Sequence, residues 1–421
     1  MSPPRRASLQ SFLATAKCAL RAPASQRPSP LTFVVGNESA DLDSLCCAIV
    51  YAYLRTHSTP ASSLSHNLHV PLANLPRADL GLRPELTAAL AHAGLRPADL
   101  ITLSDLPWDD DRPPQDGQHS TLQPADTRWL LVDHNALTGP LARFAPHVVG
   151  CVDHHVDEGA VPRDAVPRVI EPCGSCMSLV VDETRRAWDA LAAQDDAAAS
   201  AGERDDALAK LCLAPILIDT LNLGAADKVK DKDTHAVAYL EDKVLPWSVQ
   251  PYSRQALFDE LSAVKDDISE LSFRDILRKD YKQWHESGLV LGISAVVQGL
   301  AYLVDDKAAG EAQLLLDHLD TWAHERRLDV AAVMTTSHHD RPNPDGQFQR
   351  HLLLWGRSPP GRAAVVRFAD AQARPLQLHT WRDGLLDCRT GEMLRLAWRQ
   401  DELTASRKRV APLLRKAMEP A

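Results

Sequence analysis

Four apolar runs in the N-terminal half of the sequence each end abruptly in aspartate. Each run has the length of one buried strand, and the polar residues that follow it mark where the strand would stop. The runs and the residues that end them are Leu31–Val35 before Asp41 and Asp43, Arg128–Val132 before Asp133, His147–Val152 before Asp153, His154 and His155, and Leu213–Ile218 before Asp219. We therefore predict four strands of an α/β domain, with a long apolar helix over 44–54 after the first strand.

If these strands are parallel neighbours in one sheet, their carboxyl ends share one edge. The carboxylates and imidazoles that follow them would then meet in a crevice, where open α/β sheets place their ligands. So many carboxylates remain ionised together only beside cations, because like charges at short range oppose one another. Oxygen ligands mixed with imidazole suit Mn²⁺, Mg²⁺ or Co²⁺. We predict two divalent cations, about 3.5–4 Å apart, in a site that hydrolyses phosphoesters or phosphoanhydrides.

The order of these motifs resembles that of the DHH phosphoesterases. The motifs are Gly-Asn-Glu-Ser-Ala-Asp-Leu-Asp-Ser at 36–44, Asp-His-Asn at 133–135, Asp-His-His at 153–155 and Asp-Thr at 219–220. The Gly-Asn opening is similar to the exopolyphosphatase and prune branch, whereas family II inorganic pyrophosphatases usually have His where this chain has Asn37. The resemblance covers nearly the whole chain. It implies an exopolyphosphatase that removes terminal phosphate from inorganic polyphosphate.

The resemblance also implies roles for individual side chains. The implied cation ligands are Asn37 and Asp41 at one cation, Asp43 and His154 at the other, and Asp133 and Asp219 shared between both. Asp153 would orient the histidines that follow it, and His155 would act beside the transferred phosphoryl group as a hydrogen-bond donor or acid. A water or hydroxide held by both cations would be the nucleophile, without a covalent phosphoenzyme. Since an amide is a poorer ligand than imidazole, Asn37 would hold its cation weakly or through water.

A second, basic set of motifs lies in the C-terminal part of the chain. A length of 421 residues predicts two domains, which we place at 1–246 and 254–421, with a linker around 245–251. Ser-Arg-Lys at 406–408 and Asp-x-Lys at 280–282 resemble elements that grip substrate phosphates in this superfamily. The implied substrate-binding residues are His155, Lys282, Arg407, Lys408 and Arg409. The resemblance thus implies a smaller α/β DHH-associated domain, with the active site in the cleft between the two domains.

Other polar clusters have simpler interpretations. The Asp109–Asp111 run precedes Pro-Pro and predicts a solvated loop. The triplet at 338–340, His-His-Asp, lies among prolines and follows no carboxylate-ended strand, so we treat it as a decoy. Residues 192–206 are rich in Ala and Asp and predict an inserted surface loop between two helices. The lysines at 228, 230 and 232 indicate either a solvated face or a contact with substrate.

Residues 171–178 leave two interpretations open. Their small residues precede an apolar run and predict a helix N-terminus, which would either bind phosphate through backbone N–H groups or be a plain start capped by Ser175. Cys173 and Cys176 are a tight cysteine pair, but no second pair supports a zinc or redox site. The other cysteines are typical of small apolar residues in a reduced, cytosolic protein.

Composition limits the partners. The net charge of −10 argues against general nucleic-acid binding, but a local basic lining would still admit a polyanionic substrate. No apolar run approaches the roughly 18–20 residues of a membrane span. The basic N-terminal segment resembles a transit peptide, yet the apolar face of 9–20 favours a first helix packed on the domain. We expect a cytoplasmic monomer, with a mitochondrial pool as the alternative, that binds neither nucleic-acid polymers nor membranes.

Two classes of function follow. The first is a metal-dependent hydrolase: an exopolyphosphatase, or alternatively an inorganic pyrophosphatase or a prune-like nucleotide phosphodiesterase. The second is a partner-binding protein on a DHH scaffold that no longer catalyses. The intact carboxylates and histidines of all four motifs favour the enzyme, because a scaffold without catalysis would be expected to have lost at least one of them.

Overall fold

The computed structural model describes residues 6–58, 68–107, 122–194, 198–244, 252–337, 347–390 and 393–419. The predicted linker, the Asp109–Asp111 run and the triplet at 338–340 lie outside these ranges. The chain divides into two compact units, unit 1 (Met1–Val264) and unit 2 (Lys265–Ala421). The division lies C-terminal to the predicted linker because Leu257 and Leu261 of helix α7 pack in the core of unit 1.

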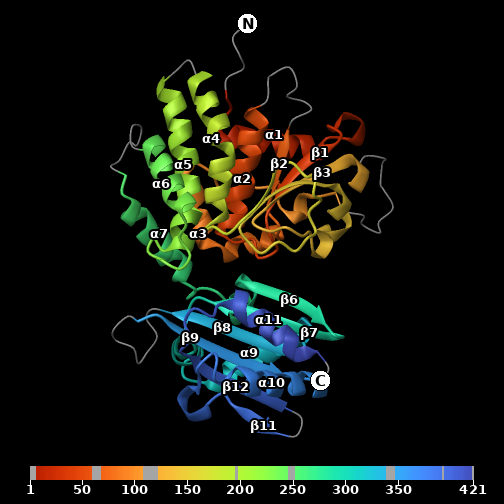
Figure 1. The fold of residues 1–421 in the computed structure, drawn as a ribbon, viewed down its shortest axis with the longest axis vertical. Helices are drawn as coiled ribbons and strands as arrows, with labels where there is room; N and C mark the ends of the chain where they lie inside the picture. Colours follow the sequence, from red (N-terminus) through yellow and green to blue (C-terminus); the bar gives the residue numbers. More distant parts are fainter. Residues whose placement is uncertain are drawn as a thin grey trace. The chain divides into compact units, whose positions relative to one another are not determined.

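Unit 1 contains one parallel five-stranded sheet in the order β2-β1-β3-β4-β5 (Figure 1). The strands are β1 (Leu31–Val35), β2 (His69–Leu72), β3 (Thr127–Val132), β4 (Val148–Asp153) and β5 (Arg168–Ile170). The helices are α1 (Leu9–Arg21), α2 (Leu42–His57), α3 (Pro84–His92), α4 (Cys176–Gln194), α5 (Ala198–Thr220), α6 (Asp231–Val244) and α7 (Arg254–Asp266). The predicted parallel α/β domain is confirmed.

Both faces of this sheet are buried, which explains the continuous apolar runs. Alternate side chains of each strand enter opposite cores. Val34 and Leu130 lie in the core shared with α2, α4 and α5. Phe33 and Trp129 lie in the other core, where their rings stack with centroids 4.7 Å apart. The central strands are therefore fixed by packing on both sides.

The predicted strand over 213–218 is wrong, because these residues form the last turns of helix α5. The run is apolar all round since α5 is enclosed by α2, α4 and α6, and Leu213, Ile216 and Leu217 are fully inaccessible to solvent. A short apolar run does not distinguish a buried helix from a buried strand by its periodicity. Helix α5 also begins at Ala198, inside the surface loop predicted over 192–206.

Unit 2 is a mixed sheet with helices on both faces. The strands along it are β10 (Leu378–Thr380), β12 (Met393–Gln400), β9 (Gln349–Gly356), β8 (Val330–Ser337), β7 (Leu289–Val296) and β6 (Tyr281–Glu286), and β11 (Cys388–Thr390) pairs with β12. The helices are α8 (Phe273–Lys279), α9 (Ala312–Glu325), α10 (Pro359–Gln372) and α11 (Arg407–Met418). Strands β7 and β8 are parallel and the other pairs are antiparallel. Among the described helices, none is both long enough and apolar enough to span a bilayer.

Candidate active site

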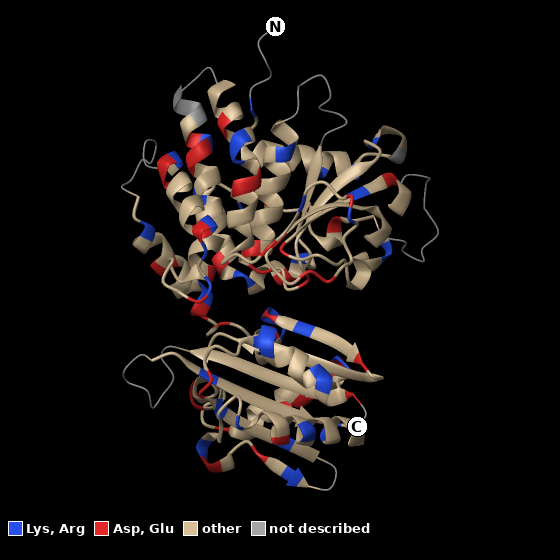
Figure 2. Cartoon of the chain, viewed as in Figure 1, with Lys and Arg blue, Asp and Glu red and all other residues tan. Residues whose placement is uncertain are grey.

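The strand order of unit 1 reverses between β1 and β3, since β2 lies on one side of β1 and β3 on the other. Open α/β sheets bind ligands at the carboxyl ends of the strands beside such a switch point. Asn37 follows β1 and Asp133 follows β3, so both lie at this point. Several acidic residues, coloured red in Figure 2, lie on the loops at this edge of the unit 1 sheet.

The loop after β1 is tied to the start of α2. A Cβ atom on Gly36 would lie 2.5 Å from the Cβ of Ser44, so only glycine fits where the strand passes the helix. The Ser44 hydroxyl accepts the Asn37 N–H at 3.1 Å and donates to Asp133 Oδ2 at 2.6 Å. Ser44 therefore joins the first motif to the second.

Asp133 is almost fully buried and is held from both sides. Its Oδ2 also accepts the Asn37 amide at 2.8 Å, while its Oδ1 lies 3.2 Å from His154 Nε2 and 3.6 Å from His155 Nδ1. The Asn37 amide oxygen accepts the Ser39 N–H at 2.8 Å. In this arrangement the Asn37 NH₂ group orients the Asp133 carboxylate.

The two histidines after β4 are fixed in defined tautomers. His154 donates Nδ1–H to the Cys173 carbonyl at 3.0 Å, and His155 donates Nδ1–H to Asp153 Oδ1 at 2.8 Å. Burial would raise the pKa of Asp153, but the hydrogen bond and charge of His155, with the Asn135 amide, outweigh it and hold that pKa at about 2. Asp153 thus stays ionised and keeps Nε2 of His155 available for a proton transfer.

Asp43 lies in the first turn of α2, buried against the N-terminus of α4. Its Oδ1 accepts from the Ser175 hydroxyl and the Met177 N–H, both at 3.0 Å, and its Oδ2 accepts the Cys176 N–H at 2.7 Å. Burial raises the pKa of Asp43 to about 6, and the nearby charge of Asp133 adds to the effect. A cation beside these two carboxylates would offset both effects and lower the pKa of Asp43.

Asp41 and Asp219 border the same region. Asp41 is exposed and caps α2 by accepting the Ser44 N–H at 3.0 Å. Asp219 lies in the last turn of α5, so it reaches the region from a helix and not from a strand. Burial raises the pKa of the Cys46 thiol most, and charge on Cys212, Asp43, Asp41 and Asp219 adds to the effect.

One potential ligand atom from each of Asp133, His154 and His155 lies within 4.8 Å of the others, so a cation held by Asp133 and His154 would lie beside His155. Carboxylate oxygen and imidazole nitrogen are the donors that Mn²⁺, Mg²⁺ and Co²⁺ accept. Burial is the largest cause of the raised pKa of Asp43, and the charges of Asp133 and Asp41 add to it, so a cation beside these carboxylates would lower that pKa. The residues at this edge therefore fit divalent cations.

Some described residues at this edge have strained backbone conformations. Non-glycine residues with positive φ occur at Ala40 (46°), at Asp133 (61°), and at three successive positions after Thr220, namely Leu221 (50°), Asn222 (55°) and Leu223 (66°). Such conformations cost about 1–3 kcal/mol each and persist only where the surroundings impose them. Ala40 and Asp133, which lie within the first two motifs, and the three residues after the fourth motif are thus held in conformations that residues other than glycine rarely adopt.

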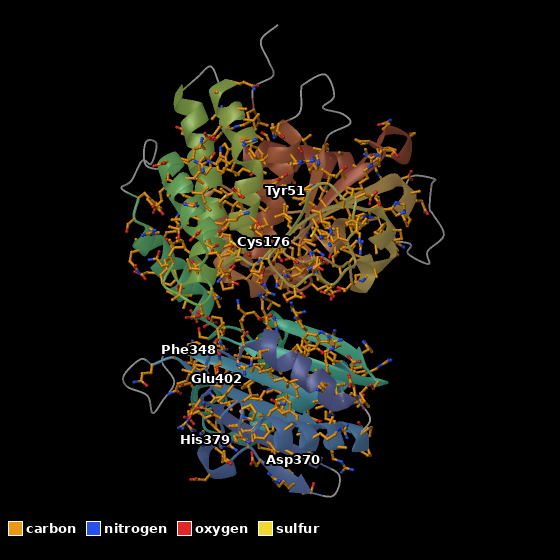
Figure 3. The ribbon with its side chains drawn as sticks, viewed as in Figure 1. Tyr51, Cys176, Phe348, Asp370, His379 and Glu402 are labelled. Carbon is orange, nitrogen blue, oxygen red and sulfur yellow. The ribbon has the colours of Figure 1, made fainter. Side chains whose placement is uncertain are left out.

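Residues 171–178 lead into the N-terminus of helix α4. The segment begins helix α4, and the N–H groups at its start already contact the carboxylates of Asp43 and Asp233. This helix N-terminus does bind anionic groups, but these groups are carboxylates of the chain itself. Burial raises the pKa of Cys173 to about 12, and the pKa of Cys176 is raised further, so both thiols stay protonated, which disfavours a zinc or redox role. Figure 3 labels Cys176 in the interior of unit 1.

Several side chains that support the site have no clear signal in the sequence. Buried Arg83 donates to the backbone carbonyls of Ser39 and Ala40, and so fixes the loop that precedes Asp41. Buried Asn135 donates to Asp153 Oδ2 at 2.6 Å. Asn135 could have been found from the Asp-His-Asn motif, whereas the role of Arg83 depends on a contact between distant segments.

In unit 2 the two basic motifs lie side by side. Arg407, at the start of α11, donates to the backbone oxygen of Asp280 at 3.1 Å and to its Oδ1 at 2.7 Å. This contact brings Ser-Arg-Lys to the start of β6, which carries Lys282. Lys408 is exposed, and Arg409 lies 3.7 Å from Glu402, which Figure 3 labels.

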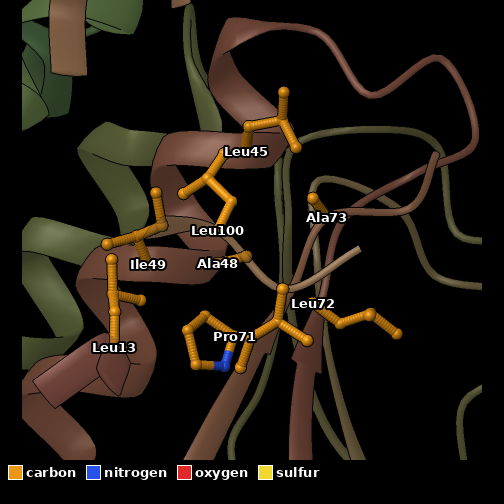
Figure 4. Close-up of a pocket in the computed structure, with 9 residues that line it drawn as sticks. Leu13, Leu45, Ala48, Ile49, Pro71, Leu72, Ala73 and Leu100 are labelled. Atoms are coloured by element: carbon orange, nitrogen blue, oxygen red, sulfur yellow. The ribbon is translucent and has the colours of Figure 1, made fainter. Parts of the chain in front are cut away.

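A small cavity in unit 1 is lined by neither carboxylates nor imidazoles. It measures about 10 Å³ and is lined by apolar side chains of α1, α2 and β2, among them Leu13, Ile49 and Leu72 (Figure 4). A volume of this size holds one water molecule at most. The cavity is a packing gap between helices and sheet.

Family comparisons match both units. The DHH family, N-terminal domain, matches residues 32–216, and the DHHA2 domain matches residues 259–417. A Schizosaccharomyces pombe protein named "Putative exopolyphosphatase" is 32% identical over 392 residues, covering 93% of this chain and 91% of that protein. "Exopolyphosphatase PRUNE1" of Bos taurus is 27% identical over 403 residues, covering 94% of this chain and 77% of that protein.

A solved structure has a similar fold. The crystal structure of a Methanococcus jannaschii "putative family II inorganic pyrophosphatase" superposes with a TM-score of 0.53 and 18% sequence identity. The superposition covers 92% of this chain and 99% of that one. At this level of identity the likeness concerns the fold: a parallel α/β unit followed by a mixed-sheet unit.

Proposed function

Since the chain belongs to the DHH family, with a DHH domain followed by a DHHA2 domain, we propose that it is a phosphoanhydride hydrolase, and specifically an exopolyphosphatase. The observation that carries the proposal is the convergence of Asp133, His154 and His155 at the switch point of the unit 1 sheet. The relatives named as exopolyphosphatases extend over most of this chain and support the same substrate.

In this proposal the ligands of two divalent cations are the residues at the carboxyl edge of the sheet. They are Asn37 and Asp41, Asp43 and His154, with Asp133 and Asp219 shared. Mn²⁺, Mg²⁺ and Co²⁺ are the candidate ions. When bound, the cations would supply charge neutralisation and Lewis acidity at the scissile phosphoryl group.

The protein's own proton donor is His155. Its Nδ1–H donates to buried, ionised Asp153, which fixes the orientation of the ring and leaves Nε2 for the phosphoryl oxygen. A proton delivered there would stabilise the phosphate that leaves. Asp153 acts through His155 and is a positioning residue.

The negative charge of the substrate requires basic side chains, and we assign this role to residues of unit 2. Lys282, Arg407 and Lys408 would hold the phosphates next to the reacting bond, and Arg409 a phosphate further along the chain. The contact between Arg407 and Asp280 holds this guanidinium beside the start of β6. We propose a functional division into a catalytic part, 1–246, and a substrate-binding part, 254–421.

We further propose a cytoplasmic monomer. All eight cysteines are free thiols, as is usual in a reducing compartment. The net charge of −10 disfavours nucleic-acid polymers as partners.

The test is phosphate release from long-chain polyphosphate, tripolyphosphate and pyrophosphate, each with Mg²⁺, Mn²⁺ or Co²⁺. The proposal expects the highest kcat/KM on polyphosphate, with loss of activity in excess chelator. Preference for pyrophosphate or for a nucleotide would replace the substrate assignment, and binding of polyphosphate without turnover would indicate a scaffold that no longer catalyses.

A further inference from the structure

One turn of the chain contacts three of the four motifs. Residues 173–178, the turn that starts α4, donate to both oxygens of Asp43 through Ser175, Cys176 and Met177. The Cys173 carbonyl accepts the Nδ1–H of His154. The turn therefore sets the orientation of one carboxylate and one imidazole that we assign to the cations.

The other side of this turn is held by Asp233, in the first turn of α6 and fully buried. Its Oδ2 accepts the Gly174 N–H at 2.9 Å, and its Oδ1 accepts the Ser175 N–H at 3.2 Å and the Ser178 hydroxyl at 2.6 Å. Its Oδ2 also accepts the Lys230 N–H at 2.8 Å, which ties in the loop that follows Asp219. One carboxylate thus binds two separate segments of the site.

The packing around Gly174 shows how closely these parts fit. A Cβ atom at this position would lie 2.7 Å from Asp233 Oδ2 and 2.7 Å from Thr220 Cγ2. Glycine is required here because the carboxylate and the residue after Asp219 both press against the backbone. A shift of Asp233 would therefore be passed to the turn directly.

We propose that Asp233 is a positioning residue that fixes the 173–178 turn and thereby sets Asp43 and His154 for cation binding. The inference rests on the proposed function, since it takes these two residues as ligands. A carbonyl that accepts Nδ1–H selects Nε2 as the ligand atom of His154. Donors aimed at Asp43 keep its carboxylate in one orientation while leaving Oδ2 with a single hydrogen bond among the described residues.

The decisive variant is Asp233→Asn in the full-length chain. An amide NH₂ group in place of one oxygen would face N–H or O–H donors of Gly174, Ser175 or Ser178, so the turn must move. Loss of an outer partner of this kind costs about 10–100-fold in metal affinity. We expect the Kd for Mn²⁺, measured by calorimetry on the protein freed of metal, to rise by that factor.

The matched control is Asp205→Asn. Asp205 is also a buried carboxylate of unit 1 and accepts from Trp188 Nε1 at 2.8 Å, but it lies on α5 about 20 Å from Asp219 by helical rise. Thermal unfolding without metal measures the stability that each variant loses. The control should lose stability yet bind Mn²⁺ within about twofold of wild type. Equal losses of affinity in both variants would mean that Asp233 acts only on general stability, and would overturn the inference.

Two further measurements keep the test decisive. If Asp233→Asn does not fold, Ser178→Ala removes one donor to Asp233 and leaves its charge, and Mn²⁺ binding should weaken severalfold; unchanged binding would overturn the inference. Ser175→Ala combined with Asp233→Asn should weaken binding by less than the product of the single effects, because both act through one turn. Wild-type protein that binds no Mn²⁺ would refute the proposed function together with this inference, whereas normal binding by Asp233→Asn would refute the inference alone.

Discussion

The variant Asp153→Asn tests whether Asp153 positions His155 for proton donation. Asp153 accepts the Nδ1–H of His155 at 2.8 Å and the Asn135 amide at 2.6 Å, and it is fully buried. An Asn side chain would keep one acceptor for His155, but its NH₂ group would then face the NH₂ group of Asn135. That amide is already fixed by the Val156 carbonyl and the Glu158 N–H, so it has no alternative orientation without loss.

The pKa of Asp153 gives the size of the stability effect. Because its folded value of about 2 lies below the usual 3.8, the carboxylate stabilises the fold above pH 4, and this contribution is lost as the pH falls toward 2. The difference corresponds to roughly 2 kcal/mol at pH 7. We expect Asp153→Asn to lose about that much free energy of unfolding in urea at pH 7.

The kinetic effect should exceed what stability alone explains. Without the carboxylate that fixes its ring, His155 would no longer be held in one orientation, so kcat on polyphosphate should fall about 10–100-fold. The control is Asp157→Asn, an exposed carboxylate in the same loop that pairs with Arg168 at 2.6 Å and should leave kcat unchanged. A variant with reduced stability but wild-type kcat would refute the assignment of His155 as acid.

Three other predictions concern the cations and the substrate path. Asn37→His should tighten binding of one cation, because imidazole is the stronger ligand for Mn²⁺ or Co²⁺, and unchanged or weaker binding in a metal titration would place Asn37 outside the ligand set. Arg409→Ala should lower kcat/KM more on long polyphosphate than on tripolyphosphate, with the difference fading in salt, and equal losses would place Arg409 beside the reacting bond. Since the pKa of Asp43 is raised to about 6, it retains its proton below that pH, so Mn²⁺ affinity should fall roughly tenfold between pH 6 and pH 5; a flat profile would count against Asp43 as a ligand.

The parallel sheet could be predicted because its strands are buried on both faces. The runs that end at Val35, Val132 and Val152 are strands as predicted, and their carboxyl ends share one edge. The fourth run could not be assigned from its pattern, because a helix enclosed on all sides shows the same continuous apolar character as a buried strand. Asp219 therefore lies in the last turn of a helix and not at the end of a strand.

The residues that support the site could not be predicted from the sequence alone. Asp231 and Asp233 lie in the same charged segment, and nothing local indicates that only Asp233 is fully buried among donors of another helix. The contact between Arg407 and Asp280 likewise joins segments far apart in the chain. Motif spacing predicts which residue types gather, whereas the partners that orient them depend on packing between distant elements.

The most direct measurement is phosphate release from long polyphosphate with Mn²⁺ by the wild-type protein and by Asp133→Asn, together with the metal content of both. Asp133 contacts Ser44, Asn37 and His154 at the centre of the site, so removal of its charge should take away most of the activity and lower the bound metal while circular dichroism shows an intact fold. Wild-type turnover with normal metal content in Asp133→Asn would contradict a site built on this carboxylate.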